Sequence, residues 1–239
     1  MASTFSSDLK LEIVATGEKA GLWGTITNTN LQILEQSASG YQDIDMAGAS
    51  VTLLLSDGAT SNGKNFYLKL SGTLAGDRTL TMPSGSERVW IISDETVRGG
   101  SNRTLSVLTA SGTSQPVPPG ATLLCVSDGT NTTTRIIEKG YATITDSNSP
   151  YPAVAGAQIF ANTTANPIEI DLPSSPAVGD EITIIDTRGT FNSNNLTIDR
   201  NGQPINSGTS NLVLNTNGQA ITLVYVDATR GWAFKTNTA

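Results

Sequence analysis

The sequence contains no histidine and only one cysteine, Cys125, and these absences remove most familiar catalytic chemistry. Without imidazole, neither a Ser-His-Asp nor a Cys-His arrangement can form, and zinc sites that use histidine are excluded. Cys125 has no second thiol for an internal disulfide, and it lies in the apolar run 123–126, which is typical of a buried, inert thiol. The sequence therefore predicts a protein that is not an enzyme and that holds no metal and no cofactor.

Charge and long apolar runs are also scarce. Only 15% of residues are charged, the net charge is -7, and the pI is about 4.5. Binding to a phosphate backbone needs clustered Lys and Arg, so we expect no nucleic-acid partner. No run of about 18 apolar residues is present to span a bilayer, and residues 1–5 lack the basic and apolar segments of a secretory signal. We expect no membrane insertion.

The residues that are abundant point to β structure. Thr, Val and Ile favour pleated, half-buried surfaces, while Gly and Asn supply the positive φ angles of tight turns. Short apolar or alternating runs, separated by turn signals such as Asp57-Gly58, Asp128-Gly129 and Asn201-Gly202, continue from residue 41 to the C-terminal end. Such spacing without helical patterns between the runs predicts an all-β fold of the sandwich or barrel type.

Four short blocks of sequence occur twice, in the same order. They pair residues 79–83 with 169–173, 89–94 with 182–186, 104–107 with 195–198, and 122–128 with 222–227. Repetition of this kind indicates a duplicated structural unit. We predict two tandem β-sandwich-like modules, residues 41–140 and 141–239.

Residues 1–40 differ from the rest and predict an N-terminal docking arm with a short helix. Thr25 or Thr27 would cap this helix and Gly40 would end it. An ordinary amphipathic helix packed on its own domain explains the pattern, and so does a helix that packs on a partner, with Asn30 setting the register. The predicted assembly interface comprises Leu22, Trp23, Ile26, Asn30, Leu31, Ile33 and Leu34.

Two further sets of side chains are candidates for chemistry or ligand binding. The carboxylate pairs Asp43/Asp45 and Asp94/Glu95 have the residue type of a glycosidase pair, but solvated charges at strand edges explain them better. Trp232, Tyr151 and Phe191 are possible sugar-stacking residues, although a position covering the core is the stronger interpretation of Trp232.

Several motifs resemble those of a known class of proteins. Residues 9–24 (LKLEIVATGEKAGLWG), followed by residues 27–31 (TNTNL), resemble the start of tail-fibre and other virion structural proteins of marine bacteriophages such as cyanophages. In those proteins a similar arm precedes a β module with a DGATSN element, here residues 57–62. Residues 178–182 (VGDEI), Asn201-Gly202 and residues 225–232 (YVDATRGW) resemble a module found in phage fibres and tail proteins.

The resemblance implies a virion component, made in the host cytoplasm: a short fibre, a tail or collar attachment, or a spike. It implies a homotrimer that contacts other virion proteins of the tail, the portal or adaptor, or the capsid. A capsid decoration protein and an adhesin for a host-surface glycan or receptor are the alternatives. Many relatives are longer and carry distal receptor-binding regions, whereas this sequence ends at Ala239, soon after the second module, which favours an attachment or decoration role.

Overall fold

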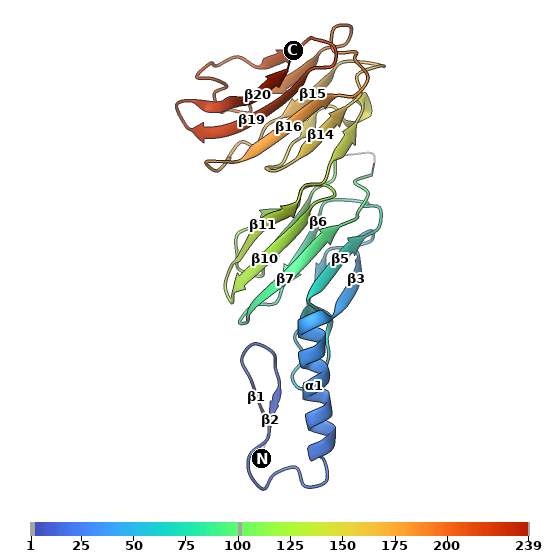
Figure 1. The fold of residues 1–239 in the computed structure, drawn as a ribbon, viewed down its shortest axis with the longest axis vertical. Coiled ribbons are helices and arrows are strands. Elements are labelled where there is room, and N and C mark those ends of the chain that lie inside the picture. The colour runs from blue at the N-terminus through green and yellow to red at the C-terminus, as the bar shows by residue number, and fades with distance from the viewer. Residues whose placement is uncertain (1–2, 100–101, 239) are drawn as a thin grey trace. The chain divides into compact units, whose positions relative to one another are not determined.

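The computed structural model describes residues 3–99 and 102–238, and strands dominate it (Figure 1). The chain divides into two compact units. The first comprises Met1–Val97, Thr104–Val117 and Thr122–Ile137, and the second comprises Arg98–Arg103, Pro118–Ala121 and Glu138–Ala239. A mostly β fold with a single α-helix among the described residues confirms that part of the prediction. That helix is not long and apolar enough to cross a membrane.

The arm belongs to the first unit and consists of a small hairpin and the helix, which lie side by side in Figure 1. Strands β1 (Thr4–Phe5) and β2 (Glu12–Ile13) pair antiparallel, and the helix α1 spans Trp23–Ser39. The helix begins earlier than predicted, after Leu22, which makes no side-chain cap hydrogen bond. It ends before Gly40, as predicted, where the backbone becomes extended. Residue 40 must be glycine because a Cβ atom there would clash with the Gln36 carbonyl and the Asn65 side chain.

The strands of the first unit form two sheets. In hydrogen-bonded order, one sheet contains β11 (Thr132–Glu138), β10 (Thr122–Asp128), β7 (Glu87–Asp94), β5 (Tyr67–Ser71) and β3 (Tyr41–Asp45), and the other contains β4 (Val51–Thr52), β6 (Arg78–Met82), β8 (Leu105–Thr109) and β9 (Gln115–Pro116). The first six strands alternate between the sheets along the chain, each parallel to the previous strand of its own sheet. Strand β9 then pairs antiparallel with β8, and β10 pairs antiparallel with β7. A short 3-10 helix, η1 (Asn62–Lys64), precedes β5.

The second unit repeats this order strand for strand. One sheet contains β12 (Ala142–Ile144), β14 (Gln158–Ala161), β16 (Glu181–Asp186), β19 (Ala220–Asp227) and β20 (Gly231–Thr238), and the other contains β13 (Tyr151–Pro152), β15 (Ile168–Asp171), β17 (Leu196–Asp199) and β18 (Leu212–Leu214). A second 3-10 helix, η2 (Asp146–Asn148), lies between β12 and β13. The first six strands again alternate between the sheets, and each is parallel to the previous strand of its own sheet. Strand β18 then pairs antiparallel with β17, β19 with β16, and β20 with β19. The predicted duplication is therefore a duplication of topology.

Strand registers identify which residues correspond between the two repeats. Leu80 pairs with Val107 in the first unit as Ile170 pairs with Ile198 in the second, in agreement with the sequence blocks. The last block is shifted by two residues, because Leu123 lies opposite Ile92 whereas Ile221 lies opposite Ile184. A shift of two leaves every side chain on its own face of the sheet, so the sequence pattern alone could not reveal it.

The predicted sandwich-like modules are not clearly present, because the arrangement resembles a short β-solenoid in which each coil gives one strand to each sheet. Alternation of apolar residues decides which face of a strand is buried, but it does not decide whether neighbours run parallel. Both sheets of the second unit nevertheless share one core. Its fully buried members include Ile159, Ile184 and Leu223 from one sheet and Ile170, Leu196 and Ile198 from the other.

Candidate functional site

The candidate site is the arm, and its local structure depends on one polar side chain. Asn30, in the middle of α1, accepts a hydrogen bond from the Glu12 backbone N–H at 3.0 Å and donates one to the Glu12 carbonyl at 2.9 Å. Both bonds fasten the helix to β2. Glu12 also forms an ion pair with Lys19 at 3.1 Å, which ties the segment before the helix to the same strand. The Asn30 amide therefore serves a contact within the chain.

The C-terminal half of α1 is joined to residues 56–64, which include the DGATSN element. Gln36 donates to the Ser61 carbonyl at 3.0 Å and accepts from the Ser61 N–H at 3.3 Å. The Gly58 N–H donates to the Lys10 carbonyl at 2.7 Å, and the Phe5 ring lies so close that a Cβ atom at Gly58 would clash with it. This segment thus contacts both the helix and the hairpin.

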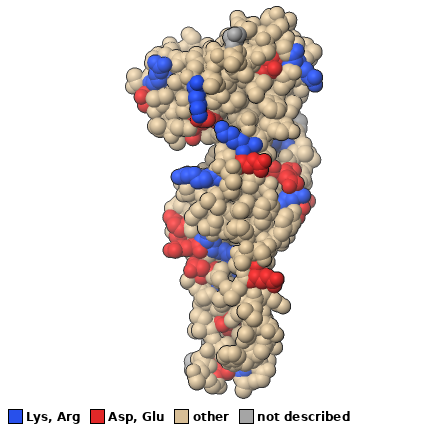
Figure 2. All heavy atoms as spheres, in the orientation of Figure 1, with Lys and Arg blue, Asp and Glu red and all other residues tan. Residues whose placement is uncertain are grey.

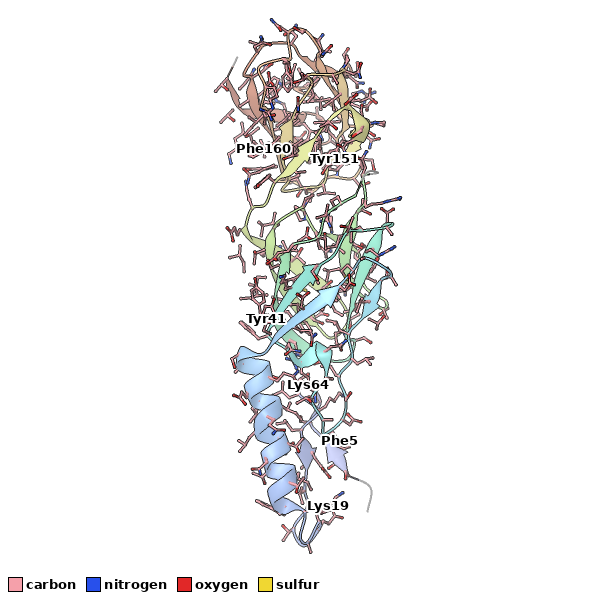
Figure 3. The ribbon with its side chains drawn as sticks, turned by 90° about the vertical axis from the view of Figure 1, so that its right-hand side faces the viewer. Phe5, Lys19, Tyr41, Lys64, Tyr151 and Phe160 are labelled. Atoms are coloured by element: carbon pink, nitrogen blue, oxygen red, sulfur yellow. The ribbon has the colours of Figure 1, made fainter. Side chains whose placement is uncertain are left out.

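Lys64 holds the same segment from inside. Its side chain is fully buried, and its ammonium group donates to the carbonyls of Ser56 at 2.7 Å and Ala59 at 2.6 Å. Burial lowers the pKa of Lys64 to about 8, and the nearby positive charge of Arg88 acts in the same direction. Figure 3 shows Lys64 where the arm meets the strands of the first unit. No pattern in the sequence indicates this role.

Asp8 and Arg88 complete the junction between the hairpin and β7. The Asp8 carboxylate accepts the Glu87 N–H at 3.0 Å, a bond that lowers the pKa of Asp8, and the Asp8 carbonyl accepts the Ser86 hydroxyl at 3.1 Å. The Arg88 guanidinium donates to the Lys64 carbonyl at 2.8 Å and lies over the Trp90 ring. The arm is therefore bonded to the first unit at several points along its length.

The structure divides the predicted assembly residues into two groups. Ile33 is fully buried, and Ile26 and Asn30 are partly buried, so these three residues serve the fold of the arm itself. Leu22, Trp23, Leu31 and Leu34 are exposed, with 63% of Trp23 accessible. Leu22 and Trp23 lie at the start of α1, close in sequence to Lys19, which Figure 3 places at the end of the arm remote from the strands.

The exposed part of the helix carries almost no charge. Glu35 is the single charged residue of α1. The face of the molecule in Figure 2 agrees with this, since most of the arm's surface there belongs to uncharged residues. A solvated helix normally presents charged and polar residues opposite its buried stripe. The arm instead offers apolar side chains with few charges, as interface cores do.

The three aromatic residues that are candidates for sugar stacking lie inside the second unit. Trp232 and Phe191 are fully buried and Tyr151 nearly so, and all three belong to the core cluster. Trp232 packs edge to face with Tyr225 at 5.6 Å between ring centroids. Rings enclosed in this way present no face to a ligand. The prediction that they stack on a sugar is therefore wrong, and the three residues pack the core.

The candidate carboxylates have structural contacts. Asp43 accepts the Ser71 hydroxyl and lies 3.7 Å from the Lys69 ammonium, which also pairs with Glu95 at 3.0 Å. Asp45 accepts the Ala47 N–H at 2.8 Å.

Burial raises the pKa of the Cys125 thiol to about 12, which keeps it protonated. Within residues 3–99 and 102–238, no group of three or more potential metal-ligating side chains occurs.

No protein-family model and no curated protein sequence matches this chain. Among solved structures, the chain is weakly similar to one described as "Structure of a chaperone-substrate complex". That match covers 82% of this chain and 35% of the other, at 14% sequence identity and a TM-score of 0.36. A likeness of this size carries no argument about fold or function. The arm surface and the duplicated strand order are the features on which a function must be argued.

Proposed function

We propose that this chain is a structural component of a bacteriophage virion, a short fibre, a tail or collar attachment or a spike, which assembles by protein–protein contacts of its arm. The sequence resemblance to phage tail-fibre proteins suggests the particle. The observation that carries the assembly role is the exposed apolar end of the arm, formed by Leu22 and Trp23. Removing a large apolar side chain of this kind from water is worth about 1.5–3 kcal/mol.

The partner in this proposal is a neighbouring virion protein of the tail, the portal or adaptor, or the capsid, and the chain itself is a homotrimer. Several copies engaged at once multiply a modest affinity per arm. The same surface would serve a capsid decoration protein. No observation favours the glycan-binding alternative, since the rings that would stack on a sugar are buried.

Incorporation into particles tests the proposal. The double variant Leu22→Ser and Trp23→Ser removes both anchors and leaves the contacts of Asn30, Gln36 and Lys64 in place. We expect its copy number per particle to fall at least about tenfold, because two buried apolar anchors together exceed about 1.4 kcal/mol. Gln32→Ser, on the exposed part of the same helix, is the matched control.

Particles that contain the double variant at the wild-type copy number would show that the end of the arm is not the anchor. Absence of the wild-type chain from purified particles would refute the virion role itself.

A further inference from the structure

The helix α1 carries a second, exposed stripe, and we infer that this stripe packs against the same stripe of another copy of the chain, with the two helices parallel. We define this outer stripe as Gly24, Thr27, Leu31, Leu34 and Ala38. The inference rests on the proposed function and deepens it by naming the surface through which the copies associate.

The spacing of the outer stripe is that of a coiled-coil seam. Its members are separated alternately by three and four residues, and at about 100° per residue they fall within an arc of about 80°. All five positions are exposed, Leu31 to 57% and Leu34 to 42%. The small residues at Gly24, Thr27 and Ala38 allow a second helix to approach closely.

The chain's own hairpin does not cover this stripe, because it contacts a different side of the helix. Asn30 bonds to Glu12, Ile33 is fully buried, and Ser37 accepts from Arg88 at 3.4 Å. Those residues define the inner side of α1, which the fold of the arm already uses. None of these contacts, which join the helix to described residues of the first unit, involves a residue of the outer stripe.

The distribution of charge favours a second copy over a different helix. Coiled coils that select a different partner commonly do so with charges at the positions flanking the seam. Here the flanking residues are Trp23, Asn28, Asn30, Glu35 and Ser37, of which only Glu35 is charged. In a parallel, in-register pair, Glu35 of one copy faces Asn30 of the other, so the two Glu35 carboxylates do not oppose each other.

The two repeats also supply an internal comparison for the sheet that begins directly after the helix. In the first unit, Tyr67, Ile91 and Leu124 lie opposite one another on the partly exposed face of adjacent strands. Tyr41, which follows the helix at Gly40 and lies at its end in Figure 3, stacks on Tyr67 at 5.6 Å.

The second unit has polar residues at the corresponding places. There Gln158, Thr183 and Thr222 lie opposite one another, and the hydroxyls of Thr183 and Thr222 are 3.1 Å apart. The fold accommodates threonine at these register positions, so it does not require Ile91 and Leu124 to be apolar. The apolar row of the first unit thus occupies a different register from that of the second unit, where Phe160 lies opposite Ile185. We infer that the row beside Tyr41 belongs to the interface between copies.

The mass of the full chain in solution, measured by light scattering, tests the inference. We expect the wild type to have a mass at least twice the 24.9 kDa of one chain. Leu31→Glu with Leu34→Glu should raise the dissociation constant at least about a hundredfold, because two charges would be buried in the seam. Thr25→Glu with Gln32→Glu places the same two charges elsewhere on the helix and should keep the wild-type mass.

Replacing Ile91 and Leu124 by the residues of the second unit, Ile91→Thr with Leu124→Thr, should raise the dissociation constant about tenfold while the melting curve still shows a folded chain. A monomeric wild type, or an unchanged mass in the Leu31→Glu, Leu34→Glu variant, would overturn the inference.

Cross-linking tests the parallel direction. The native Cys125 is fully buried, so a new surface thiol is the reactive one under mild oxidation. Thr27→Cys should form a disulfide with its own counterpart, because like positions meet in a parallel seam, and Thr25→Cys should not. Equal cross-linking of both variants would contradict the seam.

The outcomes separate this inference from the proposed function. A monomeric chain that still enters particles through Leu22 and Trp23 would end the inference and the proposed homotrimer, and would keep the role of the arm as a virion anchor. An oligomer that never joins a particle would do the reverse.

Discussion

Lys64 is an ammonium group enclosed by the fold and held by two carbonyl oxygens. Lys64→Met would leave the Ser56 and Ala59 carbonyls without this donor. Buried acceptors left unsatisfied cost about 1–3 kcal/mol, so we expect that loss in the free energy of unfolding measured with urea. Lys139→Met, at an exposed position, should change it by less than about 0.5 kcal/mol.

The pH dependence of the same residue has a defined sign. The pKa of Lys64 is about 8 in the folded chain against an ordinary value of 10.5. Between these values the unfolded chain binds more protons than the folded one, so the stability of the wild type rises with pH over that window. The rise should be absent from Lys64→Met, and a difference between the two proteins that stays constant from about pH 7 to 10.5 would contradict the assignment.

The pKa of Asp171 is shifted upward, in the opposite direction to the pKa of Lys64. Partial burial raises the pKa of Asp171, and the charge of Asp199, its register partner on β17, adds to this effect. A raised pKa means that the neutral form favours folding at acid pH and that this contribution is lost as pH rises through the folded pKa. Asp171→Asn should therefore raise Tm by about 1–2 °C near pH 7 and leave it unchanged at about pH 3.

Among the elements, the arm hairpin depends on Asn30. Asn30→Ala removes both hydrogen bonds to the Glu12 backbone, so we expect a loss of about 1–2 kcal/mol and faster amide exchange over residues 4–13. Asn30→Asp keeps the acceptor for the Glu12 N–H but sets a carboxylate oxygen against the Glu12 carbonyl, so it should not restore the stability lost in Asn30→Ala. Unchanged exchange in the hairpin of Asn30→Ala would show that other contacts suffice.

The loop after β16 depends on Asp186 in a similar way. Its carboxylate accepts backbone N–H groups at 2.9–3.3 Å, from Arg188, Gly189, Thr190, Phe191 and Gly218. Asp186→Asn replaces one acceptor oxygen by a donor facing these donors. We expect a loss of about 2–4 kcal/mol by urea unfolding, whereas Asp227→Asn, at an exposed turn with two such bonds, should lose less than about 1 kcal/mol.

Prediction from sequence succeeded where local pattern decides the outcome. The repeated apolar block at residues 195–198 becomes strand β17 (Leu196–Asp199), and Gly40 is expected to end the helix, as it does. The start of α1 could not be predicted because no side chain caps it. Pairing direction could not be predicted because apolar alternation is the same in parallel and antiparallel strands. The packing of Ile33 and Asn30 on the chain's own fold is one of the two alternatives that the sequence left open, because an apolar stripe on a helix does not identify the surface that covers it.

On the scale of the whole molecule, each compact unit has its own buried residues. Met82 and Leu172 occupy corresponding positions in β6 and directly after β15, and both are almost fully buried. Each change to Ala should cost about 2–5 kcal/mol. By calorimetry we expect two transitions, with Met82→Ala lowering one and Leu172→Ala lowering the other. A single transition shifted equally by both changes would show that the units unfold together.

Alternation of successive strands between two sheets makes one coil the increment by which such a unit can grow. An inserted coil would add one parallel strand to each sheet, and the antiparallel strands that close the unit would pair with the newcomer in the register they use now. Related chains can therefore differ in reach by whole coils while the arm and the closing strands stay the same.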